Sequence, residues 1–318
     1  MERRGSGMPA SWASSSVGMQ AVRAILQHAE LYGIFGYPIG HSLSPLMHNT
    51  AFAHYGLDAV YLPFAVPPAQ VEIAVKAIRA LHIRGVNVTI PHKQAVMAWL
   101  DELSPEARLI GAVNTVQLHD DRLVGYNTDG IGFLRSLEEA GSEVVGRTVL
   151  LLGAGGAARA IAVQLCLAGI PRLYLANRTQ TRAEELATFL KESIPHADIS
   201  VVSMKGPSLS VHLPHIDIVV NATSVGMHPH DRMVLPFADL GPRHLVCDIV
   251  YRPLHTPLLQ AAQHQGARTI DGLGMLVHQG AKAFEIWTQR SFPIPLIRAK
   301  LLGALAERST AGPAPNQR

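Results

Sequence analysis

Short runs of aliphatic residues alternate with amphipathic stretches along most of this 318-residue chain. Runs rich in aliphatic residues and bounded by Gly, Pro, Asn or Asp predict strands, and stretches with an apolar stripe predict helices. In the first part of the chain the predicted elements alternate: strand 32–36, helix 45–55, strand 59–64, helix 69–81 and strand 85–89. This order is typical of α/β proteins with parallel sheets.

The middle of the chain predicts a hairpin followed by a crossover. Residues 112–118 and 122–126 have the pattern of two strands, and His119, Asp120 and Asp121 form the turn between them. A helix is then predicted over 131–140, before the next aliphatic run.

The second half repeats the alternation of strand and helix. Strands are predicted at 148–152, 172–176, 198–203, 216–221, 244–250 and 268–270. This order is typical of a Rossmann-like, doubly wound parallel sheet. The last two predicted helices, 275–289 and 296–308, are amphipathic, and we expect them to pack back on the first part of the chain.

The most informative stretch is LLLGAGGAA, where a buried strand at 148–152 breaks into glycines and then into a helix at 157–167. The turn contains only small residues, Gly153, Ala154, Gly155 and Gly156, and Ala157 opens the helix. Gly153 permits the turn, Gly155 lets the backbone approach a phosphate, and the free helix amides favour an anion. Ala158 takes the place of a third glycine, whose task is close packing of helix on strand. The pattern predicts a dinucleotide pyrophosphate site.

Polar residues after the second strand of this unit indicate which dinucleotide binds. Roughly 20 residues after the glycines, NAD sites usually carry an acidic residue. This chain carries Asn177, Arg178 and Thr179 there, with Arg182 a little beyond. Arginines can bind a 2′-phosphate through forked, charge-assisted hydrogen bonds. In the alternative interpretation Thr179 caps the next helix and the arginines lie in its solvated first turn. Capping and phosphate binding can hold at once. We expect NADP rather than NAD.

Composition excludes several classes of protein. With 48% hydrophobic and 16% charged residues, most of the chain is not disordered. The net charge is only +3, and no dense Lys/Arg run with interleaved aromatics predicts nucleic-acid binding. No apolar segment approaches the roughly 20 residues that cross a bilayer. We expect a soluble protein with neither a nucleic-acid nor a membrane partner.

Cysteine and histidine are the residue types most able to hold a soft metal ion. Cys166 and Cys247 lie in apolar elements and are expected to be buried, reduced thiols, which suits the cytoplasm. Among the 16 histidines, His228 and His230 come nearest to a ligand pair. A proline separates them and no second pair follows, so no metal is expected.

Together these patterns predict an α/β protein of two domains with a cleft between them. Residues 31–129, completed by the C-terminal helices 275–308, would form an α/β substrate-binding and catalytic domain, and 130–274 a Rossmann-like NADP domain. Residues 1–30 have the composition of a variable extension, in which Met8 or Met19 is an alternative start and 22–29 a short helix. Residues 309–318 are expected to be a loose tail.

Polar residues gather where strands of the first domain end, which is where ligands bind in α/β sheets. Ser42 and Ser44 follow the first strand, and Pro45 suits the first helical position with Ser44 as the cap. Capping does not explain Ser42. Two hydroxyls beside a helix N-terminus predict a carboxylate site.

A second group follows the strand at 85–89. Asn87 and Thr89 alternate with Val88 and Ile90, so the two polar side chains are expected on one side of the strand end. Lys93 comes next, at a predicted helix start, where the helix dipole disfavours a cation. A catalytic lysine and an ordinary surface lysine are both consistent with this pattern.

Two more motifs complete the set. GAVNT contains Asn114 and Thr115, and YNTDG contains Asn127, Thr128 and Asp129. Asp129 either contributes a carboxylate to the site or caps the helix that follows. Together the groups supply hydroxyls and amides for a polyhydroxylated substrate, with one amine and one carboxylate for proton transfer.

On these motifs the chain resembles the shikimate dehydrogenases, the NADP-dependent enzymes of aromatic amino-acid biosynthesis. The resemblance runs from about residue 31 to 295, and its motifs occur in the family's order: GYPIGHSLSPLMHN, NVTIPHK, GAVNT, NTDG, GAGGAARA, NRT, NATSVGM and LVHQGAKAFEIW. It implies reversible hydride transfer from NADPH to the ring carbonyl of 3-dehydroshikimate, giving shikimate on the route to chorismate.

The resemblance also implies a role for individual residues. Ser42 and Ser44 would bind the substrate carboxylate, Lys93 would be the acid or base beside Asp129, and Tyr251 would contact the substrate. The ring hydroxyls would be held by Asn87, Thr89, Asn114, Asp129 and Gln279. The pyrophosphate would lie on Gly153, Ala154, Gly155, Gly156 and Ala157, and the 2′-phosphate on Asn177, Arg178, Thr179 and Arg182. The nicotinamide end would meet Thr223, Ser224, Met227, Val250 and Gly274, with core packing the alternative for Met227.

Two alternatives stay open at this point. One is a quinate/shikimate dehydrogenase of broader specificity, using NAD; the cluster at Arg178 argues against NAD but does not exclude quinate. The other is a non-catalytic NADP-binding module on the same fold, against which the presence of both Lys93 and Asp129 argues. The expected partner is a small-molecule substrate, and the sequence leaves a homodimer open.

Overall fold

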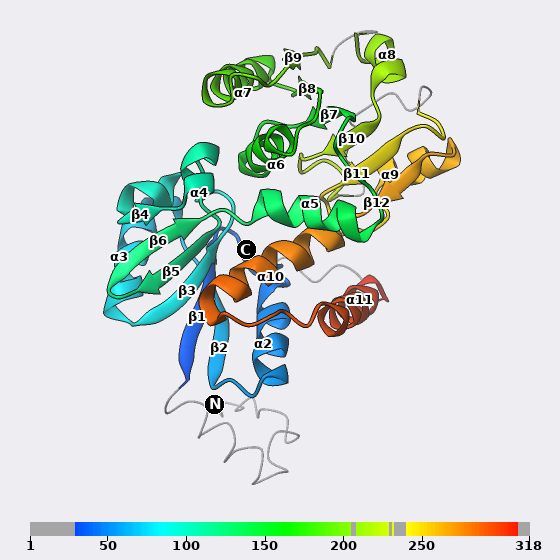
Figure 1. Ribbon diagram of the computed structural model, residues 1–318. Coiled ribbons are helices and arrows are strands. Elements are labelled where there is room, and N and C mark those ends of the chain that lie inside the picture. Colours follow the sequence, from blue (N-terminus) through cyan, green and yellow to red (C-terminus); the bar gives the residue numbers. More distant parts are fainter. Residues whose placement is uncertain (1–28, 205–207, 229–230, 232–239, 311–318) are drawn as a thin grey trace, which may run out of the picture.

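The computed structural model describes residues 29–204, 208–228, 231 and 240–310. These residues form two six-stranded sheets with helices on their faces, here called sheet A and sheet B (Figure 1). Most of the predicted helix at 22–29, both alternative starts and the tail from residue 311 lie outside the described residues.

Sheet A has the strand order β2-β1-β3-β5-β6-β4. Its strands are β1 (Glu30–Gly36), β2 (Ala59–Ala65), β3 (Ile83–Val88), β4 (Glu102–Leu103), β5 (Thr115–His119) and β6 (Arg122–Tyr126). β1 pairs parallel with β2 and β3, whereas β3, β5 and β6 pair antiparallel. The predicted hairpin is confirmed, and it makes sheet A mixed instead of wholly parallel. The strand predicted from residue 112 starts at Thr115, because the backbone before it bonds outside the sheet: the Val113 amide donates to the Lys93 carbonyl, and the Ala112 carbonyl accepts from Asn127 Nδ2.

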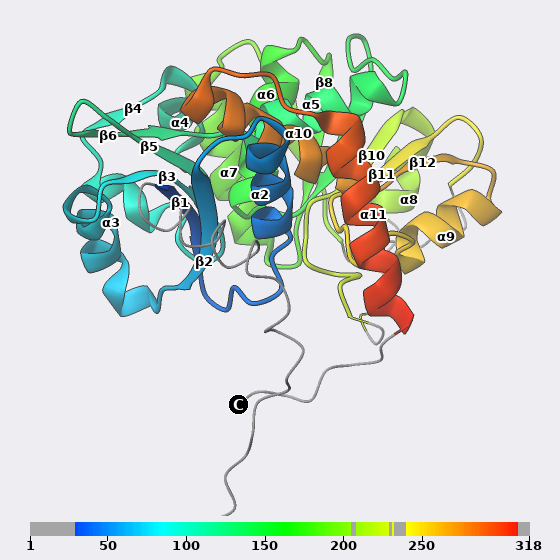
Figure 2. The same cartoon turned by 90° about the horizontal axis from the view of Figure 1, so that it is seen from below.

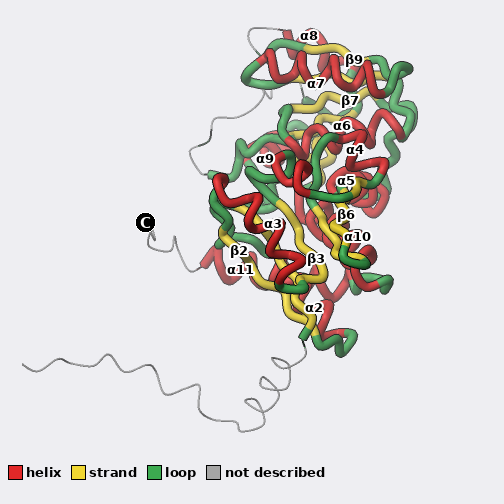
Figure 3. The backbone as a smooth tube through the Cα atoms, turned by 90° about the vertical axis from the view of Figure 1, so that its left-hand side faces the viewer, coloured by secondary structure: helices red, strands yellow, loops and turns green. Residues whose placement is uncertain are grey.

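Helices cover both faces of sheet A. On the outer face lie η2 (Pro68–Gln70), α3 (Val71–Ala80) and η3 (Ala95–Trp99), where Val75 and Ile78 pack on Val86 and Val116. Figure 3, in which that side faces the viewer, shows α3 in front of β3. The inner face is covered by α2 (Ser44–His54) and α10 (Gly272–Thr288), and α11 (Ile294–Thr310) packs on these two helices; Figure 2 shows the three side by side. The prediction that the last two helices pack back on the first part of the chain is confirmed.

Sheet B is wholly parallel in the order β12-β11-β10-β7-β8-β9. Its strands are β7 (Thr148–Leu152), β8 (Arg172–Ala176), β9 (Ile199–Val201), β10 (Ile218–Asn221), β11 (Leu245–Asp248) and β12 (Arg268–Ile270). The chain starts in the centre at β7 and winds outward in both directions, so a switch point lies between β7 and β10. The Rossmann-like prediction is confirmed. β9, β10 and β11 are shorter than predicted because the apolar run in the sequence continues past the paired residues.

Both faces of sheet B are buried, which explains why its strands read as continuous apolar runs. Leu151 faces a core with α6 (Gly156–Leu167) and α7 (Gln180–Ser193), whereas Leu150 faces the opposite core. That second core contains α8 (Ser208–His212), η4 (Leu213–His215) and α9 (Pro257–His264).

Two helices that pack against each other connect the sheets. α5 (Asp129–Glu139) follows β6 of sheet A, and α10 follows β12 of sheet B (Figure 1). α10 begins three residues before the predicted helix, because the carboxylate of Asp271 caps it by accepting a hydrogen bond from the Leu273 amide. The remaining helix, α4 (Pro105–Ile110), packs on α6 of the other sheet. Among the described helices, none is long and apolar enough to span a bilayer.

Candidate active site

The candidate site lies where the glycine turn of sheet B meets the lysine that follows β3 of sheet A. A β-carbon built on Gly156 would lie 3.4 Å from Cδ of Lys93. The predicted phosphate-binding turn and the predicted proton-transfer residue are therefore neighbours, although they belong to different sheets.

Lys93 is not a surface lysine. Its Nζ donates to Oδ2 of Asp129 at 2.5 Å, and the two side chains are only 16% and 7% exposed. It lies in the turn just before η3, a short 3-10 helix that begins at Ala95, so the predicted helix starts two residues after Lys93. Burial of the ammonium is compensated by the carboxylate.

Asp129 is the first residue of α5 and does not cap it. Thr128 precedes the helix, and the carboxylate of Asp129 is used by two other side chains. Oδ2 accepts from Lys93, and Oδ1 accepts from Nδ2 of Asn114 at 2.9 Å. The capping interpretation of Asp129 is therefore wrong.

Asn114 connects this pair to α10. Its Nδ2 also approaches Oε1 of Gln279, at 3.5 Å, and Gln279 Nε2 donates to the Leu276 carbonyl. The contact requires α10 to lie close against α5: a β-carbon on Gly132 would be 2.7 Å from the Gln279 amide nitrogen. The half-buried Tyr251 packs on the aromatic core that α10 shares with α2.

Asn87 is almost wholly buried at the end of β3. It accepts a hydrogen bond from the Tyr61 hydroxyl at 2.7 Å and donates to the Asn114 carbonyl and to Thr115 Oγ1. Thr89 is half-buried just beyond the strand. β3 ends at Val88, one residue before the predicted end, so the strand alternation stops before Thr89 and Ile90, and Ile90 is 70% exposed.

At the start of α2, the roles of the two serines differ from the prediction. The helix begins at Ser44 itself, and Ser44 makes no cap; instead its amide donates to Oγ of Ser42 at 3.2 Å. Ser42 precedes the helix and can reach a free amide that Ser44, already helical, cannot. The two hydroxyls still flank the first turn of α2.

The glycine turn has the geometry expected for a phosphate site. Gly153 has φ +113°, a left-handed conformation, and a β-carbon there would lie 2.9 Å from the Ala222 carbonyl. Gly155 stands at the N-cap of α6 and supplies no side-chain acceptor for the first amides of the helix. These amides, on Gly156, Ala157 and Ala158, are free to bind an anion.

The residues after β8 present positive charge to solvent. Arg178, Thr179 and Arg182 are exposed, and Asn177 holds the turn by donating to the Thr179 carbonyl. Thr179 occupies the N-cap position of α7, but its side chain makes no capping bond, so the capping interpretation holds only for the backbone. Within the described part of the chain, neither arginine has an ion-pair partner.

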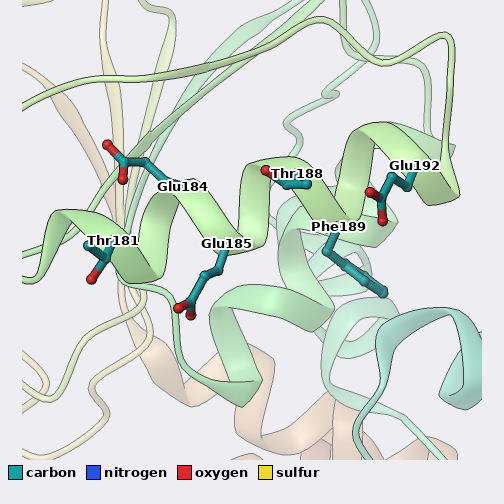
Figure 4. A pocket seen from close by; sticks show the side chains of 6 residues that line it. All are labelled: Thr181, Glu184, Glu185, Thr188, Phe189 and Glu192. Carbon is teal, nitrogen blue, oxygen red and sulfur yellow. The ribbon is translucent and has the colours of Figure 1, made fainter.

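A shallow hollow along α7 is a poor alternative site for the cofactor. Figure 4 shows its lining side chains: Thr181, Glu184, Glu185, Thr188, Phe189 and Glu192. Three carboxylates would repel a phosphate, and no predicted site residue lies among them.

The predicted nicotinamide residues are tied together by a buried polar pair at the ends of β10 and β11. Asn221 Oδ1 accepts from both the amide and the hydroxyl of Thr223, while Asn221 Nδ2 donates to Asp248. Asp248 also accepts from the Val250 amide and from Thr256, and burial raises its pKa. The loops that carry Thr223, Ser224 and Val250 are thus held by one carboxylate.

Met227 and Gly274 differ in environment. Met227 is 49% exposed, which argues against the core-packing interpretation of its side chain. Gly274 is buried in the contact of α10 with α5, where a β-carbon would lie 3.0 Å from Cβ of Ser136. Helix packing accounts for this glycine without a ligand.

Sequence reasoning missed three buried residues of the site: Tyr61, Asn221 and Asp248. Each lies within an apolar run that predicts a strand. The available signal was a hydrogen-bonding side chain inside such a run, since a buried polar group needs a partner.

The described residues show no metal-ligand cluster and no disulfide. No three His, Cys, Asp or Glu side chains in the described ranges could hold a metal ion, and His230 lies outside them. Cys166 and Cys247 are both buried and free, as predicted.

Comparisons with known proteins agree with the motif order. The chain matches the shikimate dehydrogenase substrate binding domain over residues 34–116, the shikimate / quinate 5-dehydrogenase family over 136–233 and the shikimate 5'-dehydrogenase C-terminal domain over 272–302. The shikimate dehydrogenase (NADP(+)) of Symbiobacterium thermophilum is 50% identical over 278 residues, which are 86% of this chain and 94% of that protein.

Solved structures share the fold. The shikimate 5-dehydrogenase of Thermus thermophilus, in complex with NADP(H) and shikimate, aligns with a TM-score of 0.77 and 37% identity over 86% of this chain and 99% of its own. The quinate dehydrogenase of Corynebacterium glutamicum, in complex with NAD, aligns with a TM-score of 0.81 but 33% identity, over 86% and 99% of the two chains.

Proposed function

Because the chain belongs to the shikimate dehydrogenase family, we propose that it reduces the ring carbonyl of 3-dehydroshikimate reversibly with NADPH, giving shikimate. It is an oxidoreductase that acts on a CH–OH group. The observation that carries the proposal is the buried Lys93–Asp129 pair beside the glycine turn, because it sets a proton-transfer group next to the dinucleotide site.

Lys93 and Asp129 share the proton-transfer step. NADPH, when bound, supplies the hydride, and the carbonyl oxygen gains charge as the hydride adds. Lys93 Nζ donates a proton to that oxygen, while Asp129 Oδ2 keeps the ammonium oriented. Asn114 fixes the other carboxylate oxygen, so the carboxylate cannot rotate away from the lysine.

The remaining polar groups bind the substrate around this pair. Ser42 and Ser44 take the carboxylate through their hydroxyls at the N-terminus of α2, where the helix dipole favours an anion. In this proposal Tyr251 contacts the substrate, and the ring hydroxyls are held by Asn87, Thr89, Asn114, Asp129 and Gln279. In this proposal 31–129 with 275–308 is the substrate domain and 130–274 the NADP domain.

For the cofactor, the residues present fit NADP. Gly153 to Ala157 offer a left-handed turn and uncapped amides for the pyrophosphate. The guanidinium groups of Arg178 and Arg182, which have no ion-pair partner among the described residues, are suited with Asn177 and Thr179 to a 2′-phosphate. Thr223, Ser224, Met227, Val250 and Gly274 form the proposed nicotinamide end.

The test is a steady-state assay of four pairs: NADP+ or NAD+ with shikimate or quinate. We expect the highest kcat/KM with NADP+ and shikimate. A preference for quinate would support the broader-specificity alternative, a preference for NAD+ would contradict the role of Arg178, and inactivity with all pairs would favour a non-catalytic module.

Cellular location and assembly belong to the same proposal. A cytoplasmic enzyme is supported by the two buried free thiols, which suit a reducing compartment. The homodimer that the sequence leaves open stays a prediction, and light scattering during gel filtration measures it directly.

A further inference from the structure

A hydrogen-bonded chain of side chains runs from Tyr61, in the edge strand β2, to the Lys93–Asp129 pair. Tyr61 Oη donates to Asn87 Oδ1 at 2.7 Å, and Asn87 Nδ2 donates to Thr115 Oγ1 at 3.1 Å. Thr115 Oγ1 donates to Asn114 Oδ1 at 3.1 Å, and Asn114 Nδ2 donates to Asp129 Oδ1 at 2.9 Å. In every link a donor faces an acceptor, and all four hydrogen bonds run in the direction from Tyr61 to Asp129.

We propose that Tyr61 is a positioning residue for the active site, which acts through Asn87, Thr115 and Asn114 on the carboxylate of Asp129. This inference rests on the proposed function, because it assigns Tyr61 to the same site. Tyr61 itself is fully buried and touches no solvent, so it is not a catalytic residue.

Two backbone groups fix the direction of this series of hydrogen bonds. The Asn114 carbonyl can only accept, and it takes a hydrogen bond from Asn87 Nδ2 at 3.2 Å. The Thr128 amide can only donate, and it bonds Asn114 Oδ1 at 2.8 Å. Both side-chain amides are therefore oriented by the backbone, and the donor end of Asn114 must face Asp129.

Tyr61, the first donor of this series of hydrogen bonds, is held rigidly. The Asn49 side chain of α2 bonds both backbone groups of Tyr61: its Nδ2 donates to the Tyr61 carbonyl, and its Oδ1 accepts from the Tyr61 amide. Its ring stacks on His48 with centroids 4.6 Å apart, and burial lowers the pKa of His48 to about 3, so that ring is neutral. Burial raises the pKa of the Tyr61 phenol, which therefore keeps the proton it donates.

The same series of hydrogen bonds limits which hydrogen bonds Asn87 can make with a substrate. Both hydrogens of its amide are donated within the protein, and one lone pair of Oδ1 accepts from Tyr61. No amide hydrogen of Asn87 is left for a ring hydroxyl, so toward the substrate Asn87 acts only as an acceptor.

The experiment compares Tyr61→Phe with Tyr32→Phe in shikimate oxidation with NADP+. Tyr32 is the matched control: it is 3% exposed in the same aromatic core, but its hydroxyl donates to Glu30. We expect Tyr61→Phe to lower kcat/KM for shikimate roughly fivefold, the value of one buried hydrogen bond. The KM for NADP+ stays unchanged, and the control keeps wild-type kinetics. Equal effects of both substitutions would overturn the proposal.

Two further variants separate positioning from folding. On an Asn87→Ala background, Tyr61→Phe should lower kcat/KM little further, because its effect passes through that amide; a full additional loss would overturn the proposal. Thr115→Val keeps the shape of a buried residue but cuts the chain at its middle link. It should lower kcat/KM for shikimate as Tyr61→Phe does. Wild-type kinetics in Thr115→Val would overturn the proposed positioning role of Tyr61, even if Tyr61→Phe failed to fold.

These outcomes are distinct from a failure of the proposed function. A wild-type protein that neither oxidises shikimate nor binds it in titration calorimetry contradicts the proposed function, on which the role of Tyr61 rests. An active wild-type protein with an equally active Tyr61→Phe variant contradicts the role of Tyr61 alone.

Discussion

Lys93 Nζ donates to Asp129 Oδ2 across 2.5 Å, and this buried ion pair joins the turn after β3 to the first residue of α5. Removal of one partner leaves the other charged and unpaired in a site with little access to water. The two residues are therefore expected to act as a unit in catalysis and in stability.

Lys93→Ala should lower kcat by roughly 100-fold, the usual contribution of a positioned general acid or base. The KM for shikimate should change far less, since Ser42 and Ser44 stay in place. Asp129→Asn should also lower kcat, and the double variant should lose much less than the product of the single effects. Steady-state kinetics of the four proteins give the result; independent effects would separate the two roles, and near-normal kcat in Lys93→Ala would remove the lysine from the mechanism.

Arg178→Asp should lower the preference for NADP+ over NAD+, because an exposed guanidinium is replaced by a carboxylate that repels a 2′-phosphate. The ratio of kcat/KM for the two cofactors should fall roughly ten- to hundredfold, as for loss of a charged hydrogen bond. Arg147→Asp makes the same charge change before β7, at the opposite end of that strand from the glycine turn. An unchanged ratio in Arg178→Asp, or an equal fall in the control, would place the 2′-phosphate elsewhere.

Gly132→Ala should destabilise the protein by roughly 1–3 kcal/mol, as overpacking does, and should raise the KM for shikimate. The added methyl would meet the backbone of Gln279 at 2.7 Å, and a backbone cannot move aside as a flexible side chain does. Gly303→Ala on α11 is the control, because no atom lies within 4 Å of its β-carbon and it should stabilise the helix by about 0.5–1 kcal/mol. Thermal unfolding and shikimate kinetics measure both variants. A Gly132→Ala protein as stable as wild type would show that α5 and α10 can separate freely.

Neither cysteine should react with a thiol reagent at pH 8 while the protein is folded. Burial raises the pKa of Cys166 to about 11 and raises that of Cys247 too, so both stay as protonated, inaccessible thiols. The thiolate fraction of Cys166 appears only as the pH rises toward that value. Ellman's reagent should detect both thiols in guanidinium chloride, and rapid reaction of the folded protein would contradict the burial.

Some of the site is readable from the sequence because it lies within one local unit. The glycine turn, its strand and its helix occupy consecutive residues, so the pattern at Gly153 to Ala157 contains the whole proposed phosphate site. The same holds for Arg178 and Arg182, which follow one strand end. Local order fixed these features, and the structure places them as predicted in the chain.

Capping was the weakest part of the prediction. Ser44, Asp129 and Thr179 each have a residue type that caps helices, and none of them caps with its side chain in the structure. For Asp129 the reason is tertiary: an ammonium and an amide from other elements occupy the carboxylate, and the ammonium is a stronger partner than a backbone amide.

The sequence by itself determined the α/β class, the Rossmann order and the residue types available for chemistry, because hydrophobic period and glycine placement act over a few neighbouring residues. Tertiary structure alone decided which polar groups meet. Tyr61 meets Asn87 because β2 and β3 both pair in register with β1, and Lys93 meets Asp129 because the turn after β3 lies beside the start of α5. Those contacts join residues far apart in the chain, and their partners are chosen by burial, since each polar group that loses water must bond whichever group the packing brings beside it.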